Sequence, residues 1–259
     1  MAAGSPREHQ PREVRGVKAV ILAGGRGTRL APLTMVVPKP LVPIGNVPVL
    51  EVLLRQLSDQ GFTEVVLSVD YLADLIRAYV AQRPTLTERM VIRAVQDEKP
   101  TGTAGPLVGI DGLDETFVVL NGDVLTTLDV RKLVEDHRAS NAMLTIATRR
   151  RSVRVPLGVL ETDDTGRVVE YREKPELFYR AAIGINVYEP AALEHIKPGE
   201  RLDFPDLVVR LIEAGHTVRS YETDCFWLDM GTPDEYETAQ AEARVHLARY
   251  IEDEPDDSP

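Results

Sequence analysis

Three parts of the sequence contain residue types that bind phosphate groups or the cations that accompany them. The first is a glycine-rich loop, LAGGRGTRL at 22–30, which directly follows an apolar run. Glycines let the backbone turn sharply and bring its N–H groups close to an anion. Arg26 and Arg29 add positive charge to this loop. A tight turn that binds nothing has the same composition, so the loop alone leaves both interpretations open.

The second part is a lysine held between two prolines. Lys39 is flanked by Pro38 and Pro40, and the two rings restrict the backbone around it. A lysine fixed in this way near a glycine-rich loop can neutralise a triphosphate. A surface lysine in a proline-rich connection is the alternative, and the neighbouring loop favours the first interpretation.

The third part is a pair of aspartates in distant segments. Asp123 ends the apolar run FVVLNGD, and Asp229 follows FWL. An ionised carboxylate beside a buried strand is unfavourable unless it is paired or binds a metal. Mg²⁺ takes one or two carboxylates together with phosphate oxygens and water. Either aspartate could instead cap a helix or a turn, but together they favour a magnesium site.

The sequence gives less support to three other common types of binding site. The dinucleotide-binding motif G-x-G-x-x-G/A fails because Leu30 stands at its third position, which disfavours a nicotinamide-dependent oxidoreductase. No Walker A motif is present. The five histidines are scattered without ligand spacing, so a zinc site is not expected.

Composition and charge narrow the class of protein. The 259 residues carry a net charge of −11, which argues against binding to nucleic acid or to a membrane surface. No apolar run approaches the roughly 20 residues that span a bilayer, and the start lacks the apolar region of a secretory signal. The single Cys225 fits a reducing compartment. We therefore expect a cytoplasmic protein.

The order of expected elements indicates an α/β fold. Strand-like runs alternate with amphipathic helices in the first half, which predicts a parallel-rich sheet covered by helices. The second half predicts a hairpin that turns at 163–166 within a substrate-binding lobe. Expected strands are 17–24, 64–70, 90–96, 117–123, 142–150, 181–190, 217–223 and 225–231; expected helices are 46–61, 71–83, 130–140, 204–215 and 234–251. We expect one domain at 17–250 between a flexible tail at 1–16 and an acidic tail at 251–259.

Several of these motifs together resemble a known family. LAGGRGTRL at 22–30 followed by PKPLVPIGNVPVL at 38–50 is similar to the N-terminal signature of the sugar-1-phosphate nucleotidyltransferases. The likeness continues with GTAGPL, NGD, REKP and FWLDMGTP, and it covers about 17–243. It implies a Rossmann-like three-layer sandwich with a mixed, mostly parallel central sheet and a site along the carboxyl ends of its strands.

The resemblance also implies a role for each matching residue. Arg29 and Lys39 would contact the triphosphate, Asp123 and Asp229 would hold Mg²⁺, and Lys174 would contact the sugar phosphate. Glu173 would bind the sugar, while Gly158, Ala182 and Gly184 would lie close to it. The nucleotide would be bound by Leu22, Ala23, Gly24, Gly25, Arg26, Gly27, Thr28, Asp97, Glu98, Gly102 and Thr103.

The implied reaction joins a nucleoside triphosphate to a sugar 1-phosphate and releases pyrophosphate. Asp97 and Glu98 accept hydrogen bonds only, which favours guanine, and the motifs are closest to the mannose-1-phosphate guanylyltransferase branch. Gln96 leaves a pyrimidine open. Ala182 stands where the mannose enzymes usually carry Asn, so a heptose or an unusual sugar is also open.

Two alternatives to a guanylyltransferase stay open. One is a thymidylyl- or uridylyltransferase of the same family, and the other is a non-catalytic regulatory homologue that binds an NDP-sugar. The retained set of Arg29, Lys39, Asp123, Lys174 and Asp229 argues against the regulatory homologue. The sequence leaves homo-oligomer formation open.

Overall fold

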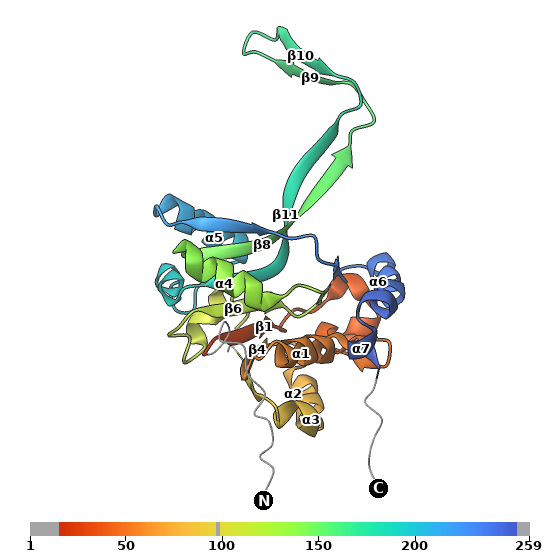
Figure 1. Cartoon of the computed structure of the whole chain (residues 1–259), viewed down its shortest axis with the longest axis vertical. Coiled ribbons are helices and arrows are strands. Elements are labelled where there is room, and N and C mark those ends of the chain that lie inside the picture. Colours follow the sequence, from red (N-terminus) through yellow and green to blue (C-terminus); the bar gives the residue numbers. More distant parts are fainter. Residues whose placement is uncertain (1–15, 97–98, 253–259) are drawn as a thin grey trace, which may run out of the picture.

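A seven-stranded sheet forms the centre of the computed structural model, which describes residues 16–96 and 99–252 (Figure 1). Its order is β12-β8-β11-β6-β1-β4-β5. All neighbouring strands are parallel except where β11 pairs with β6 and β8. These strands are β1 (Lys18–Leu22), β4 (Glu64–Val69), β5 (Val91–Gln96), β6 (Phe117–Asn121), β8 (Leu144–Arg154), β11 (Glu176–Tyr188) and β12 (Val218–Glu222).

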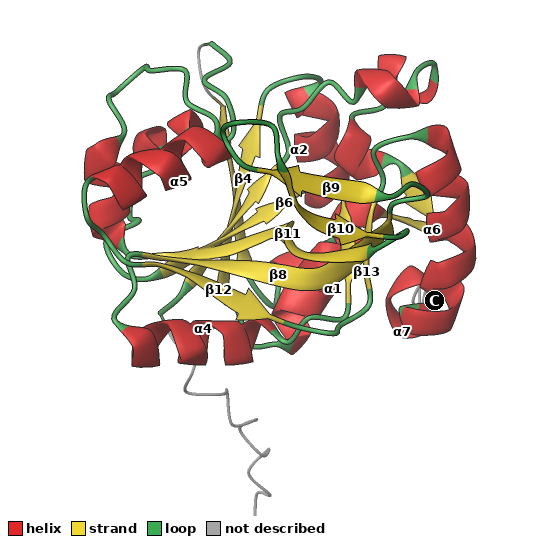
Figure 2. Ribbon diagram, turned by 90° about the horizontal axis from the view of Figure 1, so that it is seen from above, coloured by secondary structure: helices red, strands yellow, loops and turns green. Residues whose placement is uncertain are grey.

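Helices cover both faces of the sheet, and the alternation of side chains along its strands explains why (Figure 2). In β1, Ala19 and Ile21 face one apolar core while Val20 faces the other, because successive side chains of a strand point to opposite faces. One core includes α1 (Val49–Asp59), α2 (Ala73–Ala81), α3 (Pro84–Thr87), α4 (Val130–Ser140), α6 (Pro233–His246) and α7 (Ala248–Ile251); the other includes α5 (Phe204–Glu213), η5 (Gly105–Gly109) and η6 (Pro190–His195). The predicted three-layer α/β sandwich is confirmed.

Short elements outside the large sheet connect and support it. Three two-stranded sheets pair β2 with β3, β7 with β13, and β9 with β10. They and the remaining 3-10 helices are β2 (Pro43–Ile44), β3 (Val47–Pro48), β7 (Val124–Thr126), β9 (Val159–Thr162), β10 (Val168–Arg172), β13 (Trp227–Asp229), η2 (Thr28–Leu30), η3 (Leu33–Met35) and η4 (Lys39–Leu41). No helix in the described ranges is long and apolar enough to cross a bilayer.

The C-terminal helix differs from its prediction. A single helix over 234–251 was expected, but the chain breaks at Leu247, whose φ is −127°. The break turns Ile251 into the core, where its carbonyl accepts a hydrogen bond from Asn46 N at 3.0 Å. Tertiary packing therefore overrides the helical tendency of this segment.

Two strands are longer than expected and leave the sheet together. Beyond Thr148, β8 no longer pairs with β12, and it pairs only with β11 from Arg149 to Arg154. The pair projects from the body and ends in the β9–β10 hairpin (Figure 1). We call residues 149–181 the arm. Its hairpin turns at 163–166, as predicted, with the Asp163 carboxylate accepting from the backbone N–H of Thr165.

The buried Glu51 of α1 gives a stability prediction. Its carboxylate is 1% exposed and accepts hydrogen bonds from Arg55, Tyr79 and Arg83. Burial alone would raise its pKa, but the bonds from Tyr79 and Arg83 outweigh it and leave the pKa below its ordinary 4.5. Glu51→Ala is expected to lower the free energy of unfolding by about 3 kcal/mol, because it leaves Arg55, Arg83 and the Tyr79 hydroxyl without their shared buried acceptor.

Urea denaturation measures this loss, which depends on pH. A lowered pKa stabilises the fold above the ordinary value of 4.5 and ceases to do so as pH falls through the folded value. The difference between wild type and Glu51→Ala should therefore shrink in acid. Glu242→Ala, at a half-exposed pair with His246, is the matched control and should change stability little. An equal effect in both variants would contradict the prediction.

Candidate functional site

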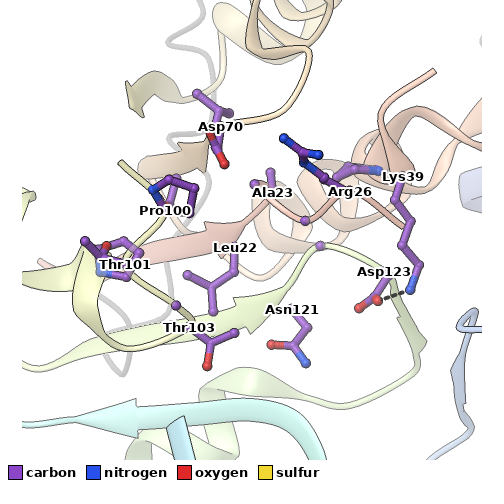
Figure 3. A pocket seen from close by; sticks show the side chains of 18 of the residues that line it. Leu22, Ala23, Arg26, Lys39, Asp70, Pro100, Thr101, Thr103, Asn121 and Asp123 are labelled. Carbon is purple, nitrogen blue, oxygen red and sulfur yellow. Dashed lines mark hydrogen bonds and ion pairs between the residues drawn. The ribbon is translucent and has the colours of Figure 1, made fainter. Parts of the chain in front are cut away.

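A cavity of about 460 Å³ lies at the carboxyl ends of β1, β4 and β6 (Figure 3). The chain order of the sheet reverses here, since β4 and β6 flank β1 on opposite sides. Open α/β sheets bind ligands at such a switch point. The cavity is lined by Leu22, Ala23, Gly24, Gly25, Arg26, Lys39, Pro40, Ser68, Val69, Asp70, Pro100, Thr101, Gly102, Thr103, Pro106, Asn121, Gly122, Asp123, Arg201 and Asp203.

The glycine-rich loop forms one wall of the cavity because its backbone packs closely on its neighbours. A Cβ on Gly24 would lie 3.1 Å from the Asp70 Cβ. Gly27 has φ +58°, and its Cβ position lies 3.1 Å from the Lys39 Cβ. A Cβ on Gly25 would meet nothing within 4 Å. The loop therefore leaves open space over Gly25 while it seals against the segment that carries Lys39.

Lys39 lies at the base of the cavity and faces both predicted metal ligands. It is 9% exposed, and its ammonium group forms an ion pair with Asp123 (Figure 3). The same nitrogen lies 3.9 Å from Asp229 Oδ1. A buried ammonium group is favourable only beside anions, and the two carboxylates provide them here.

Asp123 and Asp229 are brought together by strand pairing. β7 follows Asp123 directly and runs antiparallel to β13, with Asp229 opposite Val124. Met230 N donates to the carbonyl of Asp123 at 3.4 Å. The predicted pair of aspartates is thus adjacent in space, although it comes from opposite ends of the domain.

The electrostatics of this pair fit a divalent cation. Burial raises the pKa of Asp229, and the neighbouring Asp123 raises it further, while Lys39 and Arg29 act in the opposite direction. Asp229 Oδ1 is buried and has no hydrogen-bond partner. Among residues 16–96 and 99–252 no cluster of three or more acidic, histidine or cysteine side chains could hold a metal. A cation here would take two carboxylates and complete its shell with ligand oxygens and water.

Arg29 lies beside the same pair. A Cβ on Gly231 would be 3.0 Å from both terminal nitrogens of its guanidinium group. Gly231 N donates to Glu235 Oε2, and Thr232 caps α6 by accepting from Glu235 N. The cap therefore fixes the turn against which Arg29 rests. Gly27 and Thr28 support this turn of the loop without lining the cavity.

The opposite wall depends on a segment before α5. Gly102 has φ +91°, and a Cβ there would lie 2.5 Å from the carbonyl of Leu202. Asp203 Oδ1 accepts from Thr103 N at 3.1 Å, and Thr103 Oγ1 accepts from Phe204 N at 2.8 Å. These contacts fix the wall against the start of α5.

Five further predicted residues do not line the cavity. Gly158, Glu173 and Lys174 are exposed on the arm, where Lys174 Nζ lies 3.7 Å from Glu173 Oε1. Ala182 and Gly184 lie at the base of the arm. Gly184 has φ +75°, and its Cβ position is 2.6 Å from Asn121 Nδ2. Asp97 and Glu98 fall outside the described residues.

Sequence reasoning gave no role to several residues that line the cavity, among them the charged Asp70, Arg201 and Asp203 and the amide Asn121. Asp70 follows β4 in the same way that Asp123 follows β6, so its position after a buried strand could have revealed it. Asn121 ends β6 within the NGD motif itself. Arg201 and Asp203 precede α5 in a loop that carries no recognisable motif.

Comparison with known proteins identifies relatives of this fold and site. The family model described as Nucleotidyl transferase matches residues 18–245. A UTP–glucose-1-phosphate uridylyltransferase from Synechocystis sp. is 34% identical over 238 residues, covering 85% of this chain and 61% of that protein. A mannose-1-phosphate guanylyltransferase from Mycobacterium tuberculosis is 33% identical over 235 residues, covering 87% and 64%. The chain thus spans less than two thirds of these curated relatives.

Solved structures agree with the fold. HddC from Yersinia pseudotuberculosis superposes with a TM-score of 0.66 at 27% identity, covering 87% of this chain and 99% of that one. A complex of HddC with GMP-PN gives 0.66 at 26% identity, with the same coverage. A putative glucose-1-phosphate thymidylyltransferase from Bacillus anthracis gives 0.69 at 25% identity, covering 88% and 95%.

The like-charge pair predicts an unusual effect on stability. Because the pKa of Asp229 is raised, its ionised form is disfavoured in the fold. Asp229→Asn is therefore expected to raise Tm at pH 7 in buffer with EDTA, with a gain of up to about 1 kcal/mol after allowance for solvent screening. The gain should disappear as pH falls below the ordinary value of 3.8.

Thermal denaturation across a pH series measures this effect. Asp224→Asn, at an exposed carboxylate five residues earlier in the chain, is the matched control and should leave Tm unchanged. A lower Tm for Asp229→Asn, with no dependence on pH, would show that Asp229 stabilises the fold rather than straining it.

Proposed function

Because this chain belongs to the nucleotidyl transferase family, we propose that it joins a nucleoside triphosphate to a sugar 1-phosphate and releases pyrophosphate. One observation carries the proposal. Lys39 and Asp123 line a cavity whose wall is a glycine-rich loop, and Asp229 lies just behind them, 3.9 Å from the Lys39 ammonium group. That combination suits a polyphosphate with its cation.

In the proposed reaction, an oxygen of the sugar phosphate attacks the α-phosphorus of the nucleotide. The new P–O bond forms as the bond from the α-phosphorus to the bridging oxygen breaks, and pyrophosphate leaves with that electron pair. The attacking phosphate is already anionic at neutral pH, so no general base is needed. Catalysis then rests on positioning and on neutralising charge.

The residues of the cavity divide these tasks. Backbone N–H groups of the loop at 24–27 would hold the phosphates, with Arg26 and Arg29 as counter-charges. Lys39, now paired with Asp123, would contact the triphosphate once the nucleotide is bound. A Mg²⁺ ion held by Asp123 and Asp229 would neutralise charge on the phosphate oxygens.

We propose GTP as the nucleotide. The wall at Gly102 and Thr103 would contact the base, and Asp97 and Glu98 would accept hydrogen bonds from guanine. The guanylyltransferase from M. tuberculosis and the HddC complex with GMP-PN support this choice. The Synechocystis relative, which carries a uridylyltransferase name, makes UTP the second candidate.

For the sugar we propose a class of substrate rather than one compound. A hexose or heptose 1-phosphate would lie beside Ala182 and Gly184, with Glu173 on the sugar and Lys174 on its phosphate. Gly158 would be close to the sugar once the arm covers it. The reaction draws on nucleoside triphosphates, so we propose a cytoplasmic location, as the lone Cys225 also suggests.

A pyrophosphate-release screen tests the function. Purified protein with Mg²⁺ is crossed with ATP, GTP, CTP, UTP and dTTP against a panel of hexose and heptose 1-phosphates. Release with GTP and one sugar supports the proposal in full. Release with UTP or dTTP keeps the reaction and overturns the choice of base. Release with no pair, combined with tight NDP-sugar binding, would favour a regulatory homologue.

Removal of one metal ligand gives a sharper prediction. Asp123→Asn should lower the turnover rate about a thousandfold, because the carboxylate that holds the cation and Lys39 is lost. Steady-state pyrophosphate release measures the rate, and circular dichroism checks the fold. Asp74→Asn changes an exposed carboxylate of α2 that pairs with Arg77, and it should keep wild-type turnover. Near-normal turnover of Asp123→Asn would exclude Asp123 from the reaction.

A further inference from the structure

The arm exposes apolar surface that a chain on its own leaves in water. Sixteen large hydrophobic side chains are exposed among the described residues, and nine of them belong to the arm. Exposed apolar patches of this kind mark binding surfaces. The nine are Val153, Leu157, Leu160, Val168, Val169, Tyr171, Leu177, Phe178 and Tyr179.

The base of the arm is held in its projecting direction by the body. The Trp227 indole donates to the carbonyl of Ile183 at 2.8 Å, and the Arg151 guanidinium lies over the Trp227 ring. On the other strand, Arg180 forms an ion pair with Glu222 at 2.5 Å. These contacts lie on both strands of the arm. They oppose a rotation that would carry the arm onto its own cavity.

The cavity lacks positive charge for a second phosphate. The cations that line the cavity are Arg26, Lys39 and Arg201, with Arg29 beside it, and Lys39 is already paired with Asp123. A nucleoside triphosphate and a sugar phosphate bring more negative charge than these groups neutralise. The arm, by contrast, carries eight basic and six acidic side chains in a chain whose net charge is −11. Its Lys174 is exposed and has φ +43°.

We propose that the active site is completed by the arm of a second copy of this chain. In this arm-exchanged dimer, each arm lies across the partner's cavity and delivers Lys174 to the incoming sugar phosphate. The inference rests on the proposed function and adds where the phosphate-binding lysine comes from. Exchange of an identical element is a common route to symmetric dimers.

The body offers a surface that suits the arm. Met35 and Val36 are 66% and 72% exposed on the segment between the glycine-rich loop and Lys39. Tyr71, next to the cavity residue Asp70, donates to the carbonyl of Met35 at 2.9 Å. An apolar pair thus lies beside the cavity, where the apolar arm of a partner would cover it. The arm is net basic and the rest of the chain is net acidic, so their contact is also electrostatically favourable.

Complementation between two inactive variants tests the proposal. Asp123→Asn removes a residue of the body and Lys174→Ala removes one of the arm, so each homodimer should lose at least 90% of pyrophosphate release. The two chains are co-expressed with different tags, and the heterodimer is purified through both. Arm exchange predicts about half of wild-type activity, because one of two sites pairs an intact body with an intact arm.

Other outcomes of this experiment would contradict arm exchange. If each arm serves its own cavity, both sites of the heterodimer carry one defect and activity stays at the level of the homodimers. A heterodimer that forms but stays inactive, or a wild-type enzyme that turns over as a monomer, would overturn the proposal. Co-expressed Asp123→Asn and Asp229→Asn, both in the body, form the control and should not recover activity under either arrangement.

A second measurement does not depend on turnover. Sedimentation velocity should show a dimer for wild type and a monomer for the double variant Val169→Asp and Phe178→Asp, whose side chains are 61% and 57% exposed. Val209→Asp, at a residue of α5 exposed to 53%, should leave the dimer intact. If the screen finds no substrates while the arm variant still dissociates, the proposed function fails and the interface stands. An arm variant that sediments as wild type would refute the interface.

Discussion

The pairing of β7 with β13 places two carboxylates side by side at the edge of the cavity, one of them in its lining, and the rest of the site depends on this contact. Asp123 and Asp229 repel each other and are partly removed from water, which is unfavourable unless a cation lies between them. Lys39 supplies one positive charge from a proline-bounded segment. Asp229 Oδ1 lies 3.9 Å from this ammonium group and accepts no hydrogen bond, so one positive charge leaves the two carboxylates under-compensated. We interpret the negative charge that Lys39 does not neutralise as the capacity to bind a divalent cation together with a polyphosphate.

The sheet brings that pair beside the glycine-rich loop. β1 and β6 are neighbours, so the glycine-rich loop after β1 and the NGD turn after β6 leave the sheet together. Gly122 makes this possible, because a Cβ there would lie 2.7 Å from the carbonyl of Leu22. Close backbone contact between the two turns leaves room above them for a ligand rather than for side chains. Asp203 then closes the far wall by holding Thr103.

Much of this could be predicted from the sequence, because the relevant signals are local. Buried apolar runs predicted β1, β6 and the positions of Asp123 and Asp229, and the flanking prolines singled out Lys39. The position of Asp203 could not be predicted, because a loop before a helix carries no pattern and the contact with Thr103 joins distant segments. The break at Leu247 could not be predicted either, because helix propensity is a local property and the break depends on the packing of Ile251 into the core. The projection of the arm depends on strand pairing beyond Thr148 and on Trp227, which no local pattern specifies.

The central claim is that the two aspartates form a cation site that works together with a bound nucleotide. Electron paramagnetic resonance of Mn²⁺, titrated into the protein with a non-hydrolysable GTP analogue, tests it most directly. The account predicts one tightly bound Mn²⁺ per chain when the nucleotide is present, and loss of that binding in both Asp123→Asn and Asp229→Asn. Undiminished Mn²⁺ binding in these two variants would contradict it and would place the metal elsewhere.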